Sequence, residues 1–173
     1  LKAKKNLRLI DGTNYATEEL LKFKSFDQNI MIQSEDLNLF SKNNFKIVSK
    51  KKPTFKQLKD LIFAFNVCRY VKSNAIVLAS NETTVGIGSG QPSRLDSCQI
   101  AINKMKKFNL STDGLVAASD AFFPFVDGIE KLVQSGVRAV VQPSGSIRDK
   151  EIINFANETD TVLLFSKTRH FRH

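Results

Sequence analysis

The stretch Ala139-Val-Val-Gln-Pro-Ser-Gly-Ser-Ile-Arg-Asp149 decides the fold, because it runs from a short apolar strand through a polar turn to a helix start. The same alternation continues on both sides. Asp127 and Glu130 open a helix that ends near Gly136, and 161–165 forms a last apolar strand. Strands separated by helices predict a largely parallel sheet with both faces covered. We therefore expect an α/β domain with three layers, α/β/α.

The middle of the chain fits the same plan. Thr54 followed by Gln57 is a capping box, and apolar residues follow at helical spacing, which predicts a helix from about 55 to 71. Two apolar runs then read as a hairpin or as adjacent strands, and Ser93 with Asp96 marks a further helix start. The expected ranges are 75–79 and 84–87 for these strands, 93–107 for the helix and 115–118 for a buried strand.

The first part of the chain is weakly patterned. Short apolar runs at 7–10, 29–32 and 45–48 are separated by Asn, Asp and Ser, which predicts short strands with long connections. The character changes at Pro53. We therefore expect an irregular connector over 1–52 and a compact domain over 53–173.

Composition narrows the class of protein. A length of 173 residues suits one hydrophobic core, and no apolar run is long enough to cross a membrane. The first residues show no signal-peptide pattern. The chain begins with Leu1 rather than Met, so we expect a fragment of a longer protein. Cys68 and Cys98 fit reduced thiols in the cytoplasm, and with only two histidines a zinc site is poorly supported.

The net charge of +9 favours an anionic partner. Much of the excess lies in lysine runs, which are more often solvated surfaces than binding grooves. The sequence contains no recognised nucleic-acid module, and aromatic residues are not interleaved with the basic runs. Small anions, such as a nucleotide phosphate or a glutamate tail, are the better candidates, and we expect neither a nucleic acid nor a membrane as partner.

Alternate glycines precede the helix start at Ser93, in the stretch Gly86-Ile-Gly-Ser-Gly-Gln-Pro-Ser-Arg94. Free amides at a helix N-terminus suit an anion, and a guanidinium at Arg94 would complete a two-part anion receptor. The alternative is a strand-to-helix turn in which the glycines only relieve crowding. Spacing alone leaves the two interpretations evenly matched, and Arg94, just inside the helix, favours the anion receptor.

Aromatic and acidic residues follow the strand at 115–118. Phe122, Phe123 and Phe125 are more often core than site, but Asp120 and Asp127 border them, and carboxylates there can bind the amino edge of a stacked heterocycle. Asp127 could equally be an N-cap. The closing Arg169-His-Phe-Arg-His173 is too rich in functional side chains for a free tail, so we expect it to be tied down in a site.

These motifs resemble one family in order along the chain. Lys72-Ser-Asn-Ala-Ile-Val, Val85-Gly-Ile-Gly-Ser-Gly-Gln-Pro-Ser-Arg, Ser119-Asp-Ala-Phe-Phe-Pro-Phe-Val-Asp-Gly, the 142–149 stretch and the terminal 169–173 look like the bifunctional purine biosynthesis family, AICAR transformylase / IMP cyclohydrolase. The resemblance covers the C-terminal third of that polypeptide. It implies a cytidine deaminase-like subdomain without zinc over 53–173, and formyl transfer from 10-formyltetrahydrofolate to AICAR, which gives FAICAR.

The resemblance also implies roles for single residues. Four positions match residues that contact AICAR, with the ring of Phe122 stacking on the imidazole: Asn74, Arg94, Phe122 and Arg169. Four match the folate pocket, Leu95, Asp127, Ser146 and Ile147, and Phe171 and His173 match terminal residues that reach the same site. The family's active site is shared across a homodimer, and a monovalent cation is a further candidate cofactor.

The departure from the family pattern concerns catalysis. The catalytic Lys-His pair of the family lies upstream of the matched region, as does the cyclohydrolase domain, so we expect no general base in this segment and no turnover by the segment alone. Two alternatives stay open. One is a non-catalytic nucleotide or folate binding module that completes the active site of another chain, and the other, resting on charge alone, is a nucleic-acid binder.

Overall fold

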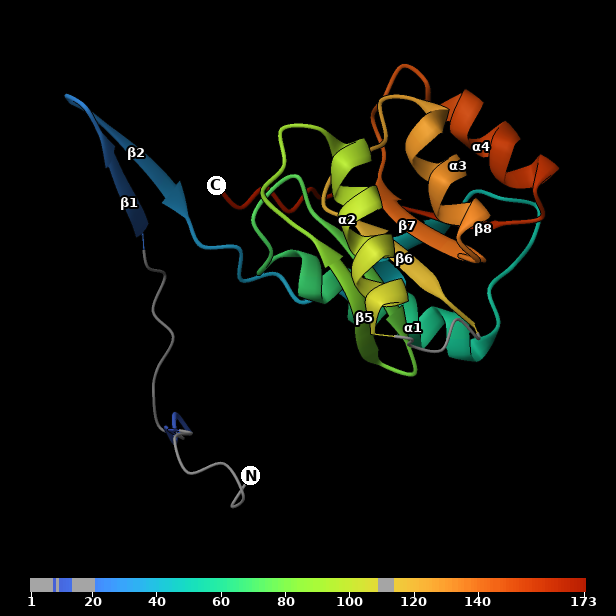
Figure 1. Ribbon diagram of the computed structural model, residues 1–173, viewed down its shortest axis with the longest axis horizontal. Coiled ribbons are helices and arrows are strands. Elements are labelled where there is room, and N and C mark those ends of the chain that lie inside the picture. Colours follow the sequence, from blue (N-terminus) through green and yellow to red (C-terminus); the bar gives the residue numbers. More distant parts are fainter. Residues whose placement is uncertain (1–7, 9, 14–20, 109–113) are drawn as a thin grey trace. The chain divides into compact units, whose positions relative to one another are not determined.

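The computed structural model describes residues 8, 10–13, 21–108 and 114–173. The chain divides into two compact units, Leu1–Leu37 and Asn38–His173. Figure 1 shows the elements of both units. Among the described residues, none of the helices has both the length and the apolar character that a bilayer crossing requires.

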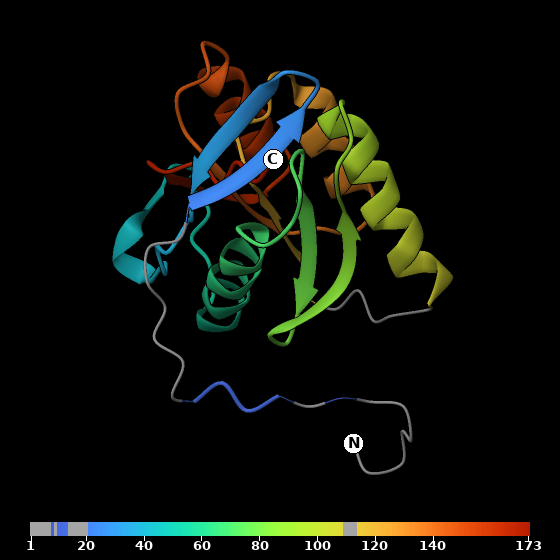
Figure 2. The same ribbon diagram turned by 90° about the vertical axis from the view of Figure 1, so that its left-hand side faces the viewer.

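The described part of the first unit contains one antiparallel hairpin, drawn in blue in Figure 2, of β1 (Leu21–Phe26) and β2 (Asn29–Ser34). The strand β2 confirms the prediction for 29–32, whereas β1 was missed and the run at 7–10 lies largely outside the described residues. Facing residues of antiparallel strands share one side of the ribbon. The apolar side carries Leu21, Phe23, Ile30 and Ile32, all more than half exposed.

The second unit is built around a six-stranded sheet in the order β3-β8-β7-β6-β4-β5. The strands are β3 (Phe45–Ile47), β4 (Ile76–Ser80), β5 (Thr83–Gly88), β6 (Val116–Ser119), β7 (Ala139–Pro143) and β8 (Val162–Ser166). The helices are α1 (Phe55–Cys68), α2 (Arg94–Lys107), α3 (Val126–Gln134) and α4 (Asp149–Glu158), and a short 3-10 helix, η1, spans Lys42–Asn44.

Helices cover both faces of this sheet, which confirms the three-layer prediction. One buried cluster joins α2, α3 and α4 to one face, and its sheet residues include Ile76, Leu78 and Leu163. The other cluster joins α1 to the opposite face through Leu61, Phe65 and their neighbours. Alternate residues of the same strands therefore serve the two cores, as the period of a strand requires.

The expectation of a largely parallel sheet was wrong. Only β6-β7 and β7-β8 are parallel, whereas β3-β8, β4-β5 and β4-β6 are antiparallel. The reason is the tight connection at Asn81 and Glu82, which reverses the chain and leaves β4 running against both of its neighbours. Both residues have positive φ, and the buried carboxylate of Asp60 accepts hydrogen bonds from their amides at 3.1 and 2.6 Å.

The predicted helices are present, with small differences at their ends. The capping box of Thr54 and Gln57 starts α1, which ends at Cys68 rather than near 71. Ser93 caps α2 by accepting from the Asp96 amide. The N-cap of α3 is Phe125, so the interpretation of Asp127 as an N-cap was wrong.

The glycines of β5 settle how closely α2 approaches the sheet. A Cβ at Gly86 would lie 2.2 Å from the carbonyl oxygen of Ala101, and one at Gly88 would lie 1.8 Å from that of Ser97. Both contacts are with helix backbone, which cannot rotate away. The interpretation that these glycines relieve crowding is therefore the one that the structure supports.

We expect Gly88→Ala to lower the free energy of unfolding by about 2 to 4 kcal/mol, because α2 must shift to admit the methyl group. Gly12→Ala is the matched control, since no atom lies within 4 Å of a Cβ at that position. Its effect should stay below about 0.5 kcal/mol. Urea denaturation followed by circular dichroism measures both. Equal stabilities of the two variants would contradict the close packing of α2 on β5.

Candidate functional site

A pocket of about 400 Å³ opens beside the first turns of α2 and α3. The segment before β4, the loop before α2 and the loop after β6 form its walls. Six of the predicted site residues line it: Asn74, Arg94, Leu95, Phe122, Asp127 and Phe171. This volume lies in the range of small-molecule sites.

The other four predicted residues lie outside this lining. The Arg169 guanidinium carbon lies 4.8 Å from the centroid of the Phe122 ring, so Arg169 contacts a residue of the pocket lining. The His173 ring lies 5.7 Å from that of Phe171. Ser146 and Ile147 sit in the loop between β7 and α4, where the Ile147 side chain is 99% exposed.

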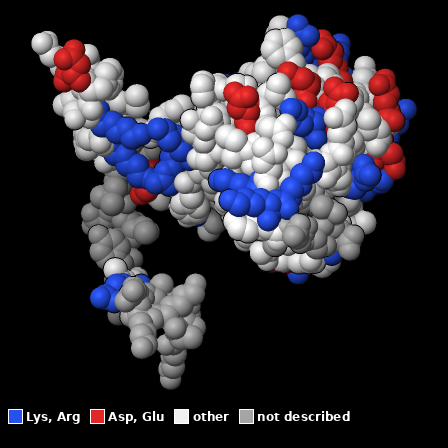
Figure 3. Space-filling view, viewed as in Figure 1, with Lys and Arg blue, Asp and Glu red and all other residues white. Residues whose placement is uncertain are grey.

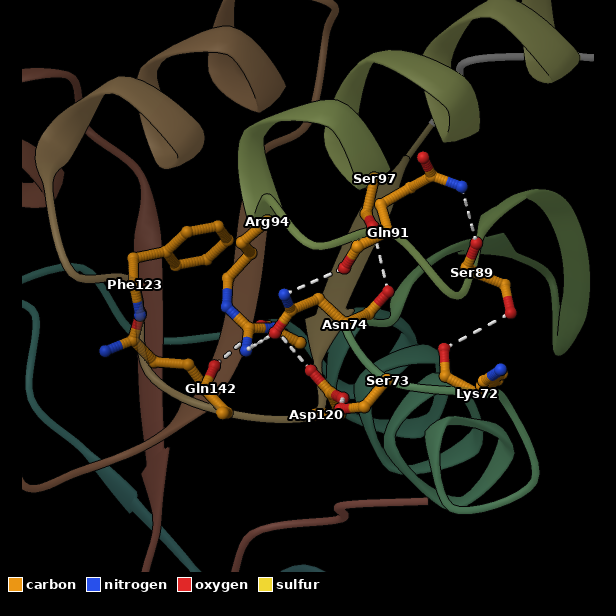
Figure 4. Close-up of polar contacts among 12 residues, drawn as sticks. Lys72, Ser73, Asn74, Ser89, Gln91, Arg94, Ser97, Asp120, Phe123 and Gln142 are labelled. Carbon is orange, nitrogen blue, oxygen red and sulfur yellow. Dashed lines mark hydrogen bonds and ion pairs between the residues drawn. The ribbon is translucent and has the colours of Figure 1, made fainter. Parts of the chain in front are cut away.

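Arg94 is held by three side chains at the base of the pocket. One terminal nitrogen donates to Ser119 Oγ at 2.9 Å and pairs with the carboxylate of Asp120, and the other donates to Asn74 Oδ1 at 2.8 Å. Figure 4 shows Arg94, Asn74 and Asp120 converging from three segments. The two-part anion receptor, in which the guanidinium would be free, is not what the structure shows, since Asp120 neutralises it.

Asn74 is equally committed. Its side-chain amide nitrogen, Nδ2, donates to the backbone oxygens of Gln91 and Pro92, both at 2.9 Å, and its main-chain carbonyl oxygen accepts from Ser97 Oγ at 2.8 Å. These bonds attach the loop before α2 to the segment before β4. The orientation of the Asn74 carboxamide is therefore fixed before any ligand arrives.

Asp120 does not face the pocket. Its side chain has no exposed surface, and its second carboxylate oxygen accepts from Ser73 Oγ. The expectation that Asp120 binds the edge of a heterocycle was therefore wrong, because both oxygens are already used. Asp127, in contrast, is exposed in the first turn of α3, lines the pocket and accepts from its neighbour Gly128.

The C-terminal strap, 167–173, is tied to the site, as expected. The His170 amide donates to the Asp120 carbonyl at 2.8 Å, and the Arg172 carbonyl accepts from the Ser73 amide at 2.9 Å. The buried His170 ring lies 4.9 Å from the ring of Phe40 and 4.4 Å from that of Phe65. These contacts place Phe171 in the pocket lining.

Sequence reasoning missed the supporting groups. Phe40, which lies in the stretch expected to be an irregular connector, packs on His170, and Ser73 was passed over beside Asn74. A signal existed only for Asp120, whose position after a buried strand was read as a ligand contact. No local pattern tells that a carboxylate at a strand end turns inward to an arginine.

The charged surface of this unit is mixed. Figure 3 shows basic and acidic side chains beside one another over its upper right-hand part, and α2 ends with Lys104, Lys106 and Lys107. Mixed charge of this kind is typical of a solvated surface. Among the described residues, no group of three or more His, Cys, Asp or Glu side chains is arranged to hold a metal ion.

The two cysteines are free and buried on opposite sides of the sheet, Cys68 in α1 and Cys98 in α2. Burial raises the pKa of Cys98 from 9.0 to about 12 and that of Cys68 well above its ordinary value. Both thiols therefore stay protonated at neutral pH, and the thiolate is the reactive form.

We expect neither cysteine of the folded chain to react readily with a thiol reagent at pH 8, whereas both should react within minutes in urea. A reagent that releases a coloured thiolate on reaction with a cysteine is used, and the absorbance of that thiolate measures the labelling. Rapid labelling without denaturant would contradict this burial.

Because the raised pKa applies only to the folded state, raising the pH from 9 towards 12 deprotonates the unfolded thiols first and lowers the free energy of unfolding.

Comparison with known proteins agrees with the resemblance. Residues 1–104 match the family model described as the AICARFT/IMPCHase bienzyme. Three relatives, each called bifunctional purine biosynthesis protein PurH, are similar over nearly the whole chain. They come from Persephonella marina, with 44% identity over 98% of the chain, Chlorobium phaeobacteroides, with 42% over 100%, and Buchnera aphidicola subsp. Schizaphis graminum, with 46% over 100%.

The chain spans about a third of the length of these curated relatives, 33% in each case. The matched family model covers more than half of the chain itself, including the segment before β4 and the first turns of α2. Both comparisons indicate the same enzyme family of purine biosynthesis. This chain belongs to the AICARFT/IMPCHase bienzyme family.

Proposed function

We propose that this chain supplies the nucleotide-binding part of an AICAR formyltransferase, which transfers a formyl group from 10-formyltetrahydrofolate to AICAR to give FAICAR. The observation that carries the proposal is the pocket itself, which brings Asn74, Arg94 and Phe122 together beside the C-terminal strap. A half-buried aromatic ring next to fixed hydrogen-bonding groups suits a planar heterocycle with polar substituents.

The Phe122 ring has a cation as neighbour and also lines the pocket. Arg169 lies over the ring at 4.8 Å, and the ring also lines the pocket, where an imidazole could stack. A cation beside a stacking ring is placed to meet the phosphate of the nucleotide. Arg94 and Asn74, with orientations fixed by their mutual hydrogen bond, are placed to meet the carboxamide.

For the folate, we propose a position that begins at Leu95 and Asp127 in the pocket and extends to the β7–α4 loop with Ser146 and Ile147. The exposed side chain of Ile147 suits an apolar contact with the pterin or the benzoyl ring. Phe171 and His173, at the end of the strap, would then border the space between the two substrates.

The general base is proposed to come from elsewhere in the enzyme. Among the described residues, neither a histidine nor a lysine lines the pocket, and His170 is buried among phenylalanines. A homodimer with a shared site, a separate cyclohydrolase domain, a cytoplasmic location and a monovalent cation belong to the same proposal. The division of the chain into a connector over 1–52 and a subdomain over 53–173 also stays a proposal.

We expect calorimetric titration with AICAR to show binding that Phe122→Ala weakens about 5- to 150-fold, because stacking of a base on an aromatic ring contributes about 1–3 kcal/mol. Arg94→Ala should abolish measurable binding. Phe55→Ala is the matched control, since Phe55 is an exposed ring at the start of α1. A folate analogue is titrated in parallel. Wild-type affinity in the Phe122 and Arg94 variants would contradict the proposal.

A pocket whose described lining residues hold no histidine and no lysine also suits a second candidate, a non-catalytic module that completes the site of another chain. The two differ in one experiment. The chain is mixed with the complementary part of a PurH relative, and FAICAR formation is followed by the absorbance of the released tetrahydrofolate. Activity that depends on Arg94 and Phe122 supports the transferase, and AICAR binding without any turnover in this mixture supports a module whose partner is a chain other than the PurH part.

A further inference from the structure

We propose that Asp120 is the positioning residue of the nucleotide site, because it fixes both Arg94 and the C-terminal strap. The inference rests on the proposed function for its effect on AICAR, but its structural part stands on Asp120 alone. Asp120 follows β6 directly and has no exposed surface. It is not among the residues that line the pocket.

The carboxylate connects two segments. One oxygen pairs with a terminal nitrogen of Arg94, in the first turn of α2, and the other accepts from the hydroxyl of Ser73, next to Asn74. Arg94 in turn donates to Asn74 at 2.8 Å. Asp120, Arg94 and the Ser73–Asn74 segment therefore form one closed set of contacts, visible in Figure 4.

The main chain of Asp120 adds a further bond to the segment before β4 and a bond to the C-terminal strap. Its amide donates to the Ala75 carbonyl at 3.2 Å, and its carbonyl accepts from the His170 amide at 2.8 Å. The His170 bond carries the strap, whose neighbours Arg169 and Phe171 border the pocket. A displacement of Asp120 thus moves groups on both sides of the pocket.

The charge of Asp120 has a specific consequence for Arg94. A guanidinium has five N–H groups, and three are used on Asn74, Ser119 and Asp120. The remaining two are then directed by the bonds already made, since a guanidinium is planar and rigid. Asp120 also compensates the buried positive charge of Arg94, which without this partner would be costly to bury.

The contacts of Asp120 show that it can position other groups but cannot contact a ligand itself. Both of its carboxylate oxygens have partners and its side chain is fully buried, so it can act on a substrate only through Arg94 and the strap. Loss of Asp120 should then weaken AICAR binding by a larger factor while Arg94 is present than in its absence, where only the effect through the strap remains. A general loss of packing would weaken binding by the same factor in either background.

The test compares Asp120→Ala with the matched control Asp96→Ala, an exposed carboxylate on α2. AICAR is titrated into the wild type, Asp120→Ala, Arg94→Lys and the double variant. We expect Asp120→Ala to raise the Kd at least tenfold when Arg94 is present, and by a factor at least three times smaller in the Arg94→Lys background, where only the effect through the strap remains. Equal factors in both backgrounds, or a Kd unchanged by Asp120→Ala, would overturn the role of Asp120 in orienting Arg94.

Hydrogen–deuterium exchange gives a readout that needs no ligand. We expect the amides of 167–173 to exchange at least tenfold faster in Asp120→Ala than in the wild type or Asp96→Ala, while those of α4 stay unchanged. If Asp120→Ala does not fold, Ser73→Ala replaces it, because this variant removes one contact without unpairing a charge. The amides of 167–173 should then exchange at least threefold faster than in the wild type. Wild-type exchange of the strap in a folded variant overturns the inference.

The two readouts separate the failures. If the wild type does not bind AICAR, the proposed function fails for this chain, and the exchange experiment still decides whether Asp120 holds the strap. If the wild type binds AICAR and both readouts are insensitive to Asp120, the proposed function survives and the inference fails.

Discussion

The buried ion pair between Arg94 and Asp120 is the interaction on which the candidate site depends. The two side chains are 8% and 0% exposed, so the surrounding polar groups replace the water that each has lost. Ser119 and Asn74 complete the set around the arginine, and Ser73 completes it around the carboxylate. Removing one partner of such a pair leaves an uncompensated buried charge, which is strongly destabilising. The two side chains are therefore held together, although the pair itself contributes little net stability.

The ion pair forms because the backbone brings α2 unusually close to the sheet. Two glycines of β5 allow the helix carbonyls of Ala101 and Ser97 to lie where a side chain would otherwise stand. The first turn of α2 therefore lies low over the strand ends, and Arg94 reaches the residue that follows β6. Gly86 and Gly88, which suggested an anion-binding loop, thus contribute to the site indirectly, because they position the helix that carries Arg94.

Much of the fold could be predicted, because helix caps and strand runs are local signals. The capping box at Thr54 and the cap at Ser93 each place a helix start correctly. Strand direction is not local, and the antiparallel position of β4 follows from a tight turn without glycine, which the buried Asp60 holds from α1. The sequence allowed this hairpin, since the runs at 75–79 and 84–87 fitted either a hairpin or adjacent strands, but the turn lacks the glycine that would have decided between them.

In the candidate site, too, some features could be predicted from local sequence and others could not. The residues that resemble family positions gather mostly in one pocket, but their partners could not be predicted, since an inward carboxylate and an outward one look alike in sequence. Asp120 and Asp127 illustrate this: seven positions apart on either side of three phenylalanines, one is buried against Arg94 and the other is exposed at the pocket. The reason is geometric. Asp120 directly follows a central strand, where the first turn of α2 covers it, whereas Asp127 lies in the first turn of α3, whose amides favour an acidic residue near solvent.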